Sequence, residues 1–428
     1  MTRHLASLVL LAAFAARAEA PPAGGASLSL DEAVSLAIRD NVEIQSLRAK
    51  AQAMQERPAQ AGALENPMLT FRGMDMAEDG DFPDANEKQF AVEQAIPGFG
   101  KRGWRRRAAE QEAAAMGYEV EAMVLDVVLE VKEAYHGLWS ARQARGILRD
   151  EADVLARLET VARTAYAAGQ SEQPDVLKAQ AESTMLKARL FELEAQIRTL
   201  EARLNILTGR AADEPLEIAP PPALPEMEAD AEILRARAGG SRPEIGRAAA
   251  ALERARIERR LMGRESVPDY RLGVEYRTFR DDEPDMAMFM VGIDLPIWRG
   301  RTRAGIREAD RMIASRQAAL EASKLRADLD VRQAHFNAKA SRETLSLYRD
   351  TLIPQARSGF EAGEAGYRAG KVDFMDLLES ERFLLEARIL AAMAEGEAGM
   401  QAARLERALG SAEEREGDAG RNEQGKWP

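Results

Sequence analysis

The chain repeats its own pattern, and this duplication limits its possible folds more than any other feature of the sequence. Residues 166–177 read YAAGQSEQPDVL and residues 367–378 read YRAGKVDFMDLL, so Tyr, Gly, Asp and Leu recur 201 positions later. The segment NVEI at position 41 likewise returns as RPEI at position 242. Self-similarity at a fixed long period indicates two copies of one structural unit.

Each copy predicts a helix, two strands, a long helix, a break and another helix. Residues 103–166 contain no proline and place apolar side chains at helical spacing, so they predict a rod of roughly 90–100 Å. Shorter helices are expected at about 30–63 and 175–208. The break then forms the turn of a helical hairpin, with Gly169 as the C-terminal cap and Pro174 just ahead of the next helix.

Four short segments alternate apolar and polar residues, which is typical of strands. They lie at about 66–76 and 87–97 in the first copy and at 268–279 and 285–297 in the second. Their length fits strands that cross an outer membrane as a barrel, with apolar residues facing lipid and polar residues facing the lumen. The same alternation fits hairpins that lie on the protein's own helices. Because four strands cannot close a barrel, membrane-spanning strands would require several chains to share one.

The ends of the chain and its centre differ in composition from the repeats. Residues 1–20 have a basic start, an apolar run and a small-x-small ending, which predicts a cleaved secretory signal peptide. The repeats are then expected at 21–213 and 229–410, joined by a proline-rich linker at 214–228, with a disordered tail at 411–428.

Composition excludes several classes of function. The net charge is −12, and we interpret the interspersed acidic and basic residues as solvated helix faces without a basic patch, so no nucleic acid is expected as a partner. The chain has no cysteine, which rules out disulfides, thiolate metal sites and a lipid-acceptor cysteine. No nucleophile or carboxylate constellation surrounds His136 or His335, so we expect no enzyme activity and no cofactor.

Several motifs in matching order carry a resemblance to a known family. The strand boundaries NPML and IPGFGKRG are answered by VPDY and LPIWRGR, and both copies have the YxAG turn. Over about residues 28–410 the chain resembles an outer-membrane efflux protein of the TolC family. The resemblance implies a mostly α fold with a membrane β-barrel. In that fold a homotrimer forms a 12-stranded barrel on a long α-helical periplasmic tunnel, with a belt from residues 210–240 and the chain ends.

The function implied is a passive exit duct in the outer membrane of a Gram-negative bacterium. An inner-membrane pump drives the substrate through a periplasmic adaptor, or membrane fusion protein, into the duct. IPGFGKRG and LPIWRGR look most like the branch that serves heavy-metal cation pumps of the resistance-nodulation-division type, although many members of that branch are lipoproteins and this chain lacks the cysteine. A multidrug or type I secretion outlet is the alternative within the class. A periplasmic coiled-coil adaptor or structural protein is the alternative outside it.

The resemblance also assigns roles at the two turns. Asp376 and Glu379 would project into the tunnel aperture, where threefold symmetry gives carboxylate rings that favour cations. The alternative is a pair of solvated acids near a helix N-terminus. Asp175 and Tyr367 match residues that close the tip, but the family's basic position is Val372 here, with Lys371 one residue earlier.

Two further sets of residues complete the predicted sites. The adaptor-contact pattern matches in its glycines but has polar third positions: Ala168, Gly169 and Gln170, and Ala369, Gly370 and Lys371. Met286, Met288 and Met290 share one strand face, and their thioethers could bind soft Cu(I) or Ag(I). Adaptable packing is the alternative for this stripe.

Overall fold

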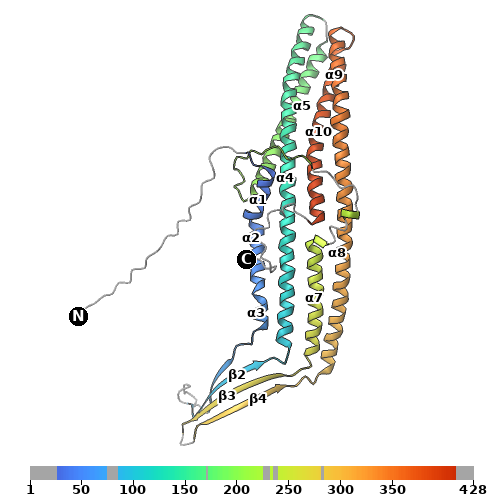
Figure 1. Cartoon of the computed structure of the whole chain (residues 1–428). Helices are drawn as coiled ribbons and strands as arrows, with labels where there is room; N and C mark the ends of the chain where they lie inside the picture. Colours follow the sequence, from blue (N-terminus) through green and yellow to red (C-terminus); the bar gives the residue numbers. More distant parts are fainter. Residues whose placement is uncertain are drawn as a thin grey trace, which may run out of the picture.

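A computed structural model describes residues 27–74, 85–169, 172–224, 232–234, 240–280 and 284–410. The predicted signal peptide and C-terminal tail lie outside these residues. The molecule is an elongated bundle with the strands at one end and the turns of two helical hairpins at the other (Figure 1). Within the described ranges, none of the helices combines the length and the apolar character needed to cross a bilayer.

Both repeats follow the predicted order of elements. The first consists of α1 (Leu30–Asp40), α2 (Val42–Gln55), α3 (Arg57–Gly62), β1 (Met68–Met74), β2 (Glu87–Ile96), α4 (Lys101–Ala167) and α5 (Gln173–Leu207). The second consists of α7 (Pro243–Arg264), β3 (Asp269–Phe279), β4 (Met286–Asp294), α8 (Arg299–Leu347), the π-helix η2 (Tyr348–Leu352), α9 (Ile353–Arg368) and α10 (Phe374–Leu409).

The helix expected at 30–63 is divided into three, and Asn41 causes the first of the two breaks. The Asn41 side-chain oxygen accepts hydrogen bonds from the backbone N–H groups of Glu43 and Ile44, which caps α2. Its amide donates to the carbonyl oxygen of Leu207 at 3.2 Å. The kink therefore ties the start of the repeat to the end of α5.

The second long helix also departs from the first. The π-helix η2 immediately precedes α9, whose first turn contains Pro354. Proline cannot donate a backbone hydrogen bond and crowds the preceding turn, and a π-turn is a common way to absorb that disruption. The two repeats thus share their order but not the continuity of their longest helix.

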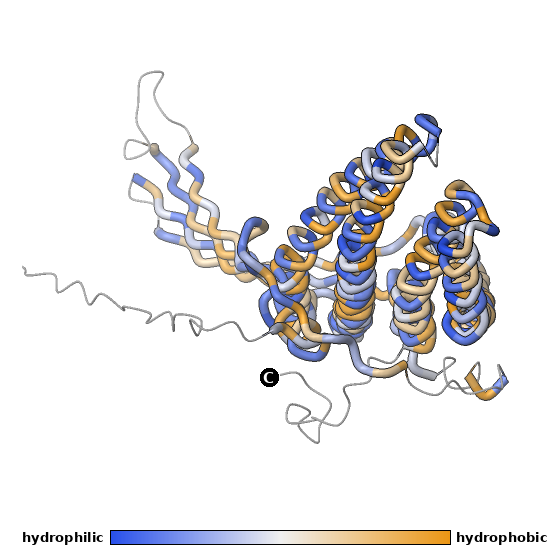
Figure 2. Tube along the Cα trace, turned by 90° about the horizontal axis from the view of Figure 1, so that it is seen from above, coloured by the Kyte–Doolittle hydropathy of each residue, from blue (hydrophilic) through white to orange (hydrophobic). Residues whose placement is uncertain are grey.

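The four strands form one antiparallel sheet in the order β1-β2-β3-β4. Phe71 pairs with Phe90, which pairs with Tyr276, while Val274 pairs with Phe289. The register therefore gathers apolar side chains from all four strands on one face, and hydropathy alternates along the strands in Figure 2. This face is open to the surroundings, since Phe71, Val274 and Phe289 are 57%, 54% and 70% exposed.

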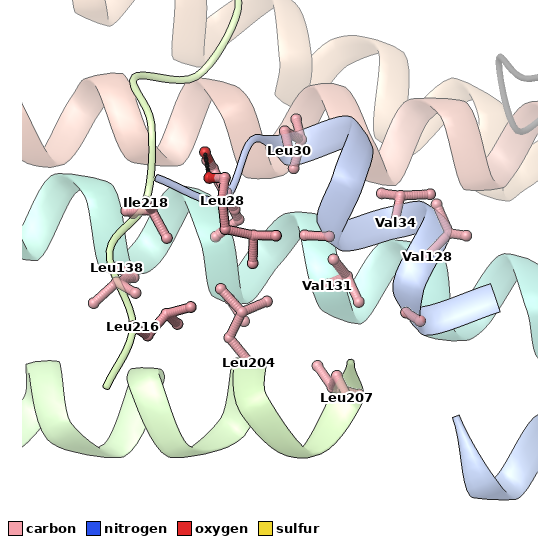
Figure 3. Close-up of a cluster of buried hydrophobic side chains, with 14 of the residues drawn as sticks. Leu28, Leu30, Val34, Val128, Val131, Leu138, Leu204, Leu207, Leu216 and Ile218 are labelled. Carbon is pink, nitrogen blue, oxygen red and sulfur yellow. Dashed lines mark hydrogen bonds between the residues drawn. The ribbon is translucent and has the colours of Figure 1, made fainter. Parts of the chain in front are cut away.

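The main hydrophobic core surrounds the middle of α4 (Figure 3). The Tyr135 hydroxyl lies 2.9 Å from the carbonyl oxygen of Leu28 and 2.7 Å from that of Ala219. Leu28 and Ile218 form a parallel bridge beside it. The segment before α1 and the segment after α5 are therefore both fastened to α4 at Tyr135.

Small residues allow α10 to lie close to α4. A Cβ atom on Gly399 would clash with the ring of His136, and one on Gly396 would lie 2.6 Å from the Cβ atom of Ser140. Burial, together with the charge of Lys132, lowers the pKa of His136 to about 4. The imidazole is consequently neutral at neutral pH and serves as a packing surface between the two repeats.

Candidate functional site

The turns of the two hairpins have the same backbone geometry. Gly169 and Gly370 both adopt φ of 71°, in the left-handed region that favours glycine. Each donates its N–H to the carbonyl oxygen of the tyrosine three residues earlier, at 3.0 Å in both cases. The repeated YxAG motif is therefore a helix C-cap that turns the chain into the next helix.

The residues predicted to contact an adaptor lie on the outer surface of these turns. Ala168 and Gly169 are exposed on the first turn, and Ala369, Gly370 and Lys371 are exposed on the second. Gln170 falls outside the described residues. The backbone is exposed at both glycines, and the role of this surface in adaptor contact stays a prediction.

The two predicted aperture acids lie on the exposed side of α10. Asp376 and Glu379 are both exposed, whereas Phe374, Leu377 and Leu378 are buried on the opposite side. The carboxylate of Asp373 caps this helix by accepting from the N–H of Asp376 at 2.8 Å. Two carboxylates one turn apart thus face away from the core at the tip, as a ring of acids around an aperture would require.

The tip-closure residues are not joined to one another within this chain. Tyr367 packs edge-on against Phe374, with ring centroids 5.9 Å apart. Among the described residues, no hydrogen bond or ion pair links Asp175, Tyr367 and Lys371. Closure by these residues stays a prediction.

Val372 stands where the resemblance implies a basic residue, and its side chain packs within the second hairpin. Its Cγ2 atom fills the space beside Gly366, where an added Cβ would lie only 2.6 Å away. The valine therefore packs within its own hairpin and carries no charge that could reach another turn.

A buried carboxylate pair that the sequence analysis missed lies between α4 and α10. Glu151 and Glu381 are only 2% and 3% exposed and are hydrogen-bonded to each other. Burial raises the pKa of both groups, to about 9 for Glu381, with the hydrogen bond and charge of Glu151 adding to the increase. The pair therefore holds a proton at neutral pH.

A small cavity of about 40 Å³ adjoins this pair. Its apolar lining includes Leu155, Leu186 and Leu385, and Oε1 of Glu151 has no hydrogen-bond partner among the described residues. Each acid interrupts an apolar stripe, because Glu151 stands between Leu148 and Leu155 at helical spacing. That interruption was the available sequence signal for a buried carboxylate.

The opposite face of the sheet carries charges and the methionine stripe. Arg277 pairs with Glu87 at 3.1 Å, and Arg271 pairs with Asp294 at 3.1 Å. The methionine stripe of β4 lies opposite residues of β3: Met286 pairs with Arg277, Met288 with Glu275 and Met290 with Gly273. In the described part of the chain, no cluster of three or more His, Asp or Glu side chains could hold a metal ion. Binding of a soft metal by the thioethers stays a prediction.

Both halves of the chain match one known protein family. The profile of the family described as outer membrane efflux protein matches residues 33–210 and 234–411. The cobalt-zinc-cadmium resistance protein CzcC of Cupriavidus metallidurans is 26% identical over 404 residues, covering 91% of this chain and 92% of its own length.

Solved structures share the fold. The outer-membrane channel OprN superposes with a TM-score of 0.76 at 20% identity, covering 90% of each chain. The structure of CusC also gives a TM-score of 0.76, at 16% identity, with 92% of this chain and 96% of CusC covered. Both alignments therefore extend over most of the two repeats.

Proposed function

The chain belongs to the outer membrane efflux protein family, and we propose that three copies of it form one duct whose periplasmic tips receive substrate from an adaptor. Proteins of this family are outer-membrane channels of Gram-negative bacteria that extend into the periplasm, and the chain is such an efflux channel and not an enzyme. The mostly helical body and the terminal sheet are its periplasmic and membrane parts.

The unpaired edges of the sheet support the proposal that the protein is a trimer. Within the described residues, β1 and β4 each pair with a strand on one side only. An unpaired edge inside hydrocarbon leaves backbone groups without hydrogen bonds, so another strand must complete it. Joining β4 of one copy to β1 of the next gives twelve strands from three copies, with the apolar face outward and the charged face toward the lumen.

We assign heavy-metal cations as the substrate class. The support is the likeness to CzcC, a cobalt-zinc-cadmium resistance protein, over nine-tenths of both chains. The exposed acids Asp376 and Glu379 add to it, because rings of carboxylates attract cations and repel anions. A multidrug or type I secretion outlet is the competing assignment within this family.

The hairpin tips supply the docking surface for the adaptor, which links the duct to an inner-membrane pump. The support is the matched pair of exposed glycine turns at the end of the molecule farthest from the sheet (Figure 1). The rival assignment, that the chain is itself a periplasmic adaptor or a structural coiled coil, does not account for a sheet with an exposed apolar face.

The native mass of the protein tests the proposed assembly. The protein is extracted from isolated outer membranes in mild detergent and its mass is measured by light scattering. We expect a mass of three chains with bound detergent. A monomer or dimer, or recovery in the soluble periplasmic fraction, would refute the shared barrel.

A deletion strain tests the substrate class separately. Its growth is compared with that of the complemented strain in cobalt, zinc, cadmium, silver and a panel of drugs. We expect sensitivity to divalent metals that the intact gene reverses. Sensitivity confined to drugs would replace the metal assignment with the multidrug alternative.

A further inference from the structure

Where the strands leave the sheet, both repeats present the same order of side chains. β2 ends at Ile96 and is followed by Phe99, which is 83% exposed; β4 ends at Asp294 and is followed by Trp298, which is 76% exposed. Basic residues begin within two positions of each aromatic residue, in KRGWRRR at 101–107 and RGRTR at 299–303. The order along the chain is therefore apolar strand face, exposed aromatic ring and then positive charge.

These segments depart from the expectation that basic and acidic residues are interspersed along the helices. Residues 97–107 contain five basic residues and no acidic one, and residues 295–307 contain four basic residues and no acidic one. The interspersed pattern describes the helices as a whole, but the local composition at the strand exits departs from it. The chain is acidic overall, with a net charge of −12, but these two stretches are strongly basic.

Three helices bring this positive charge to one level of the molecule. The Trp104 ring of α4 lies 4.8 Å from the Arg107 guanidinium carbon and 5.3 Å from that of Arg260 on α7. A Cβ atom added to Gly305 of α8 would lie 2.8 Å from the sulfur of Met262 on α7. The starts of α4 and α8 and the end of α7 therefore pack side by side, directly next to the sheet.

The junction between these helices and the sheet is fixed by a buried lysine. Lys101 is 2% exposed, and its Nζ atom lies 2.9 Å from Asp269 and 3.6 Å from Glu265. A Cβ atom on Gly98 would lie 2.5 Å from the carbonyl oxygen of Pro268, so the backbone there approaches the next repeat closely. The surrounding arginines are consequently held at a set distance from the strands.

Several arginines at this level are exposed and form no ion pair with the described part of the chain. We call six of them the basic collar, and none of the six lies within ion-pair distance of a described carboxylate: Arg105, Arg107, Arg264, Arg299, Arg301 and Arg303. Some arginines farther along the helices are paired, as Arg332 is with Asp328 and Arg407 with Asp126. Others on α8, including Arg311, Arg316 and Arg326, are exposed and also form no ion pair with a described residue. The collar is therefore distinguished by its position beside the sheet, where no ion pair with a described residue neutralises its charge.

We propose that the basic collar binds the anionic headgroups of phospholipids in the periplasmic leaflet of the outer membrane. This inference rests on the proposed barrel, which sets the apolar sheet face in hydrocarbon. Phe99 and Trp298 then occupy the interfacial level that aromatic side chains favour, and the arginines lie one layer farther out, among the phosphates. A guanidinium group forms paired hydrogen bonds with a phosphate, and clusters of basic residues beside a membrane attract anionic lipid.

The test compares lipid binding by the intact trimer with that of two triple variants on α8. Arg299→Gln, Arg301→Gln and Arg303→Gln together remove half of the collar. Arg311→Gln, Arg316→Gln and Arg326→Gln remove the same charge from exposed arginines farther from the sheet. Each trimer is placed in nanodiscs of phosphatidylcholine alone or of an equal mixture with phosphatidylglycerol, and retained phosphatidylglycerol and the dissociation temperature of the trimer are measured.

We expect phosphatidylglycerol to stabilise the native and control trimers but to have less than half that effect on the collar variant. The affinity of the collar variant for this lipid should fall by roughly fivefold for each arginine that no longer binds a headgroup. Equal lipid effects in all three proteins would overturn the inference while leaving the channel intact. A second result would also overturn it. The collar variant could dissociate at the same temperature in both lipids, and at a lower temperature than the native trimer in either lipid. The arginines would then stabilise the trimer by pairing with a neighbouring copy. If the native protein forms no trimer, the proposed barrel itself fails.

Discussion

The carboxyl groups of Glu151 on α4 and Glu381 on α10 are hydrogen-bonded to each other where the two repeats pack together. A carboxyl group donates a hydrogen bond only when it is protonated, so this contact requires a shared proton. Burial is the main cause, and the charges of Arg388 and Glu182 act on the pKa of Glu381 in opposite directions. The interface between the repeats is therefore sensitive to pH.

The first prediction concerns the sign of that sensitivity. Because the folded pKa of Glu381, about 9, lies above its ordinary value of 4.5, the folded state retains a proton that the unfolded state releases. This contribution is complete below pH 4.5 and is lost as the pH rises through about 9. Glu381→Gln keeps a hydrogen-bond donor and should flatten this dependence, raising the melting temperature at pH 9 by roughly 2–4 °C or more.

Thermal scans by circular dichroism at several pH values measure this effect. Glu386→Gln is the matched control, because Glu386 is an exposed acid on the same helix. The control should retain the native slope of stability against pH. Parallel slopes for native protein and Glu381→Gln would contradict the shared proton.

The second prediction concerns the aperture. Replacing Asp376 with Asn and Glu379 with Gln removes about six negative charges from a trimer without changing side-chain size, and the permeability ratio of cations over anions should fall by roughly twofold or more. Reversal potentials in planar bilayers under a salt gradient measure the ratio, with Glu386→Gln as the control. An unchanged ratio would identify the two acids as ordinary solvated residues.

The third prediction concerns the packing of α10 on α4. Gly399→Ala places a methyl group against His136 and should lower the free energy of unfolding by about 1–3 kcal/mol. Gly146→Ala is its counterpart on α4, where nothing lies within 4 Å, and there alanine should stabilise the helix by up to about 1 kcal/mol. Thermal unfolding of both variants measures the difference, and a similar effect of the two would disprove the close approach.

The fourth prediction concerns the second hairpin turn. Gly370 adopts φ of 71°, so Gly370→Ala should cost about 1–2 kcal/mol locally and distort the proposed adaptor surface. Gly370→Asn should cost less, because asparagine tolerates this conformation. Metal resistance of a deletion strain that carries each variant is the readout, with equal amounts in the outer membrane verified by immunoblot. Full resistance with alanine would show that this turn is not needed for docking.

Much of the architecture could be predicted because its signals are periodic and repeated. The alternation in Tyr270, Leu272 and Val274 predicted the two-faced sheet, and pairing with Phe289 and Val291 places the apolar residues together. Asparagine is a common capping residue, but the helical periodicity on both sides of Asn41 favours one continuous helix. The expected helix at 30–63 was too long for that reason.

Pairings between distant residues could not be predicted in the same way. Glu151 and Glu381 lie in different repeats, and the apolar stripe that each interrupts indicates burial of the acid but does not identify its partner. Only packing of α10 on α4 makes each the partner of the other. Likewise, RGRTR at 299–303 and KRGWRRR at 101–107 are far apart in the sequence. They form one basic surface only because the fold places both strand exits at the same level.

The attachment of both flanking segments at Tyr135 makes the tip half of α4 a lever. From Tyr135 to the end of α4 at Ala167 the helix extends about 48 Å. A tilt of about 5° at this fulcrum would move the hairpin turn by about 4 Å, since a rigid helix carries rotation along its whole length. In the proposed trimer, such a tilt in each copy would change the diameter of the tunnel entrance while the residues next to Tyr135, at the fulcrum, move least.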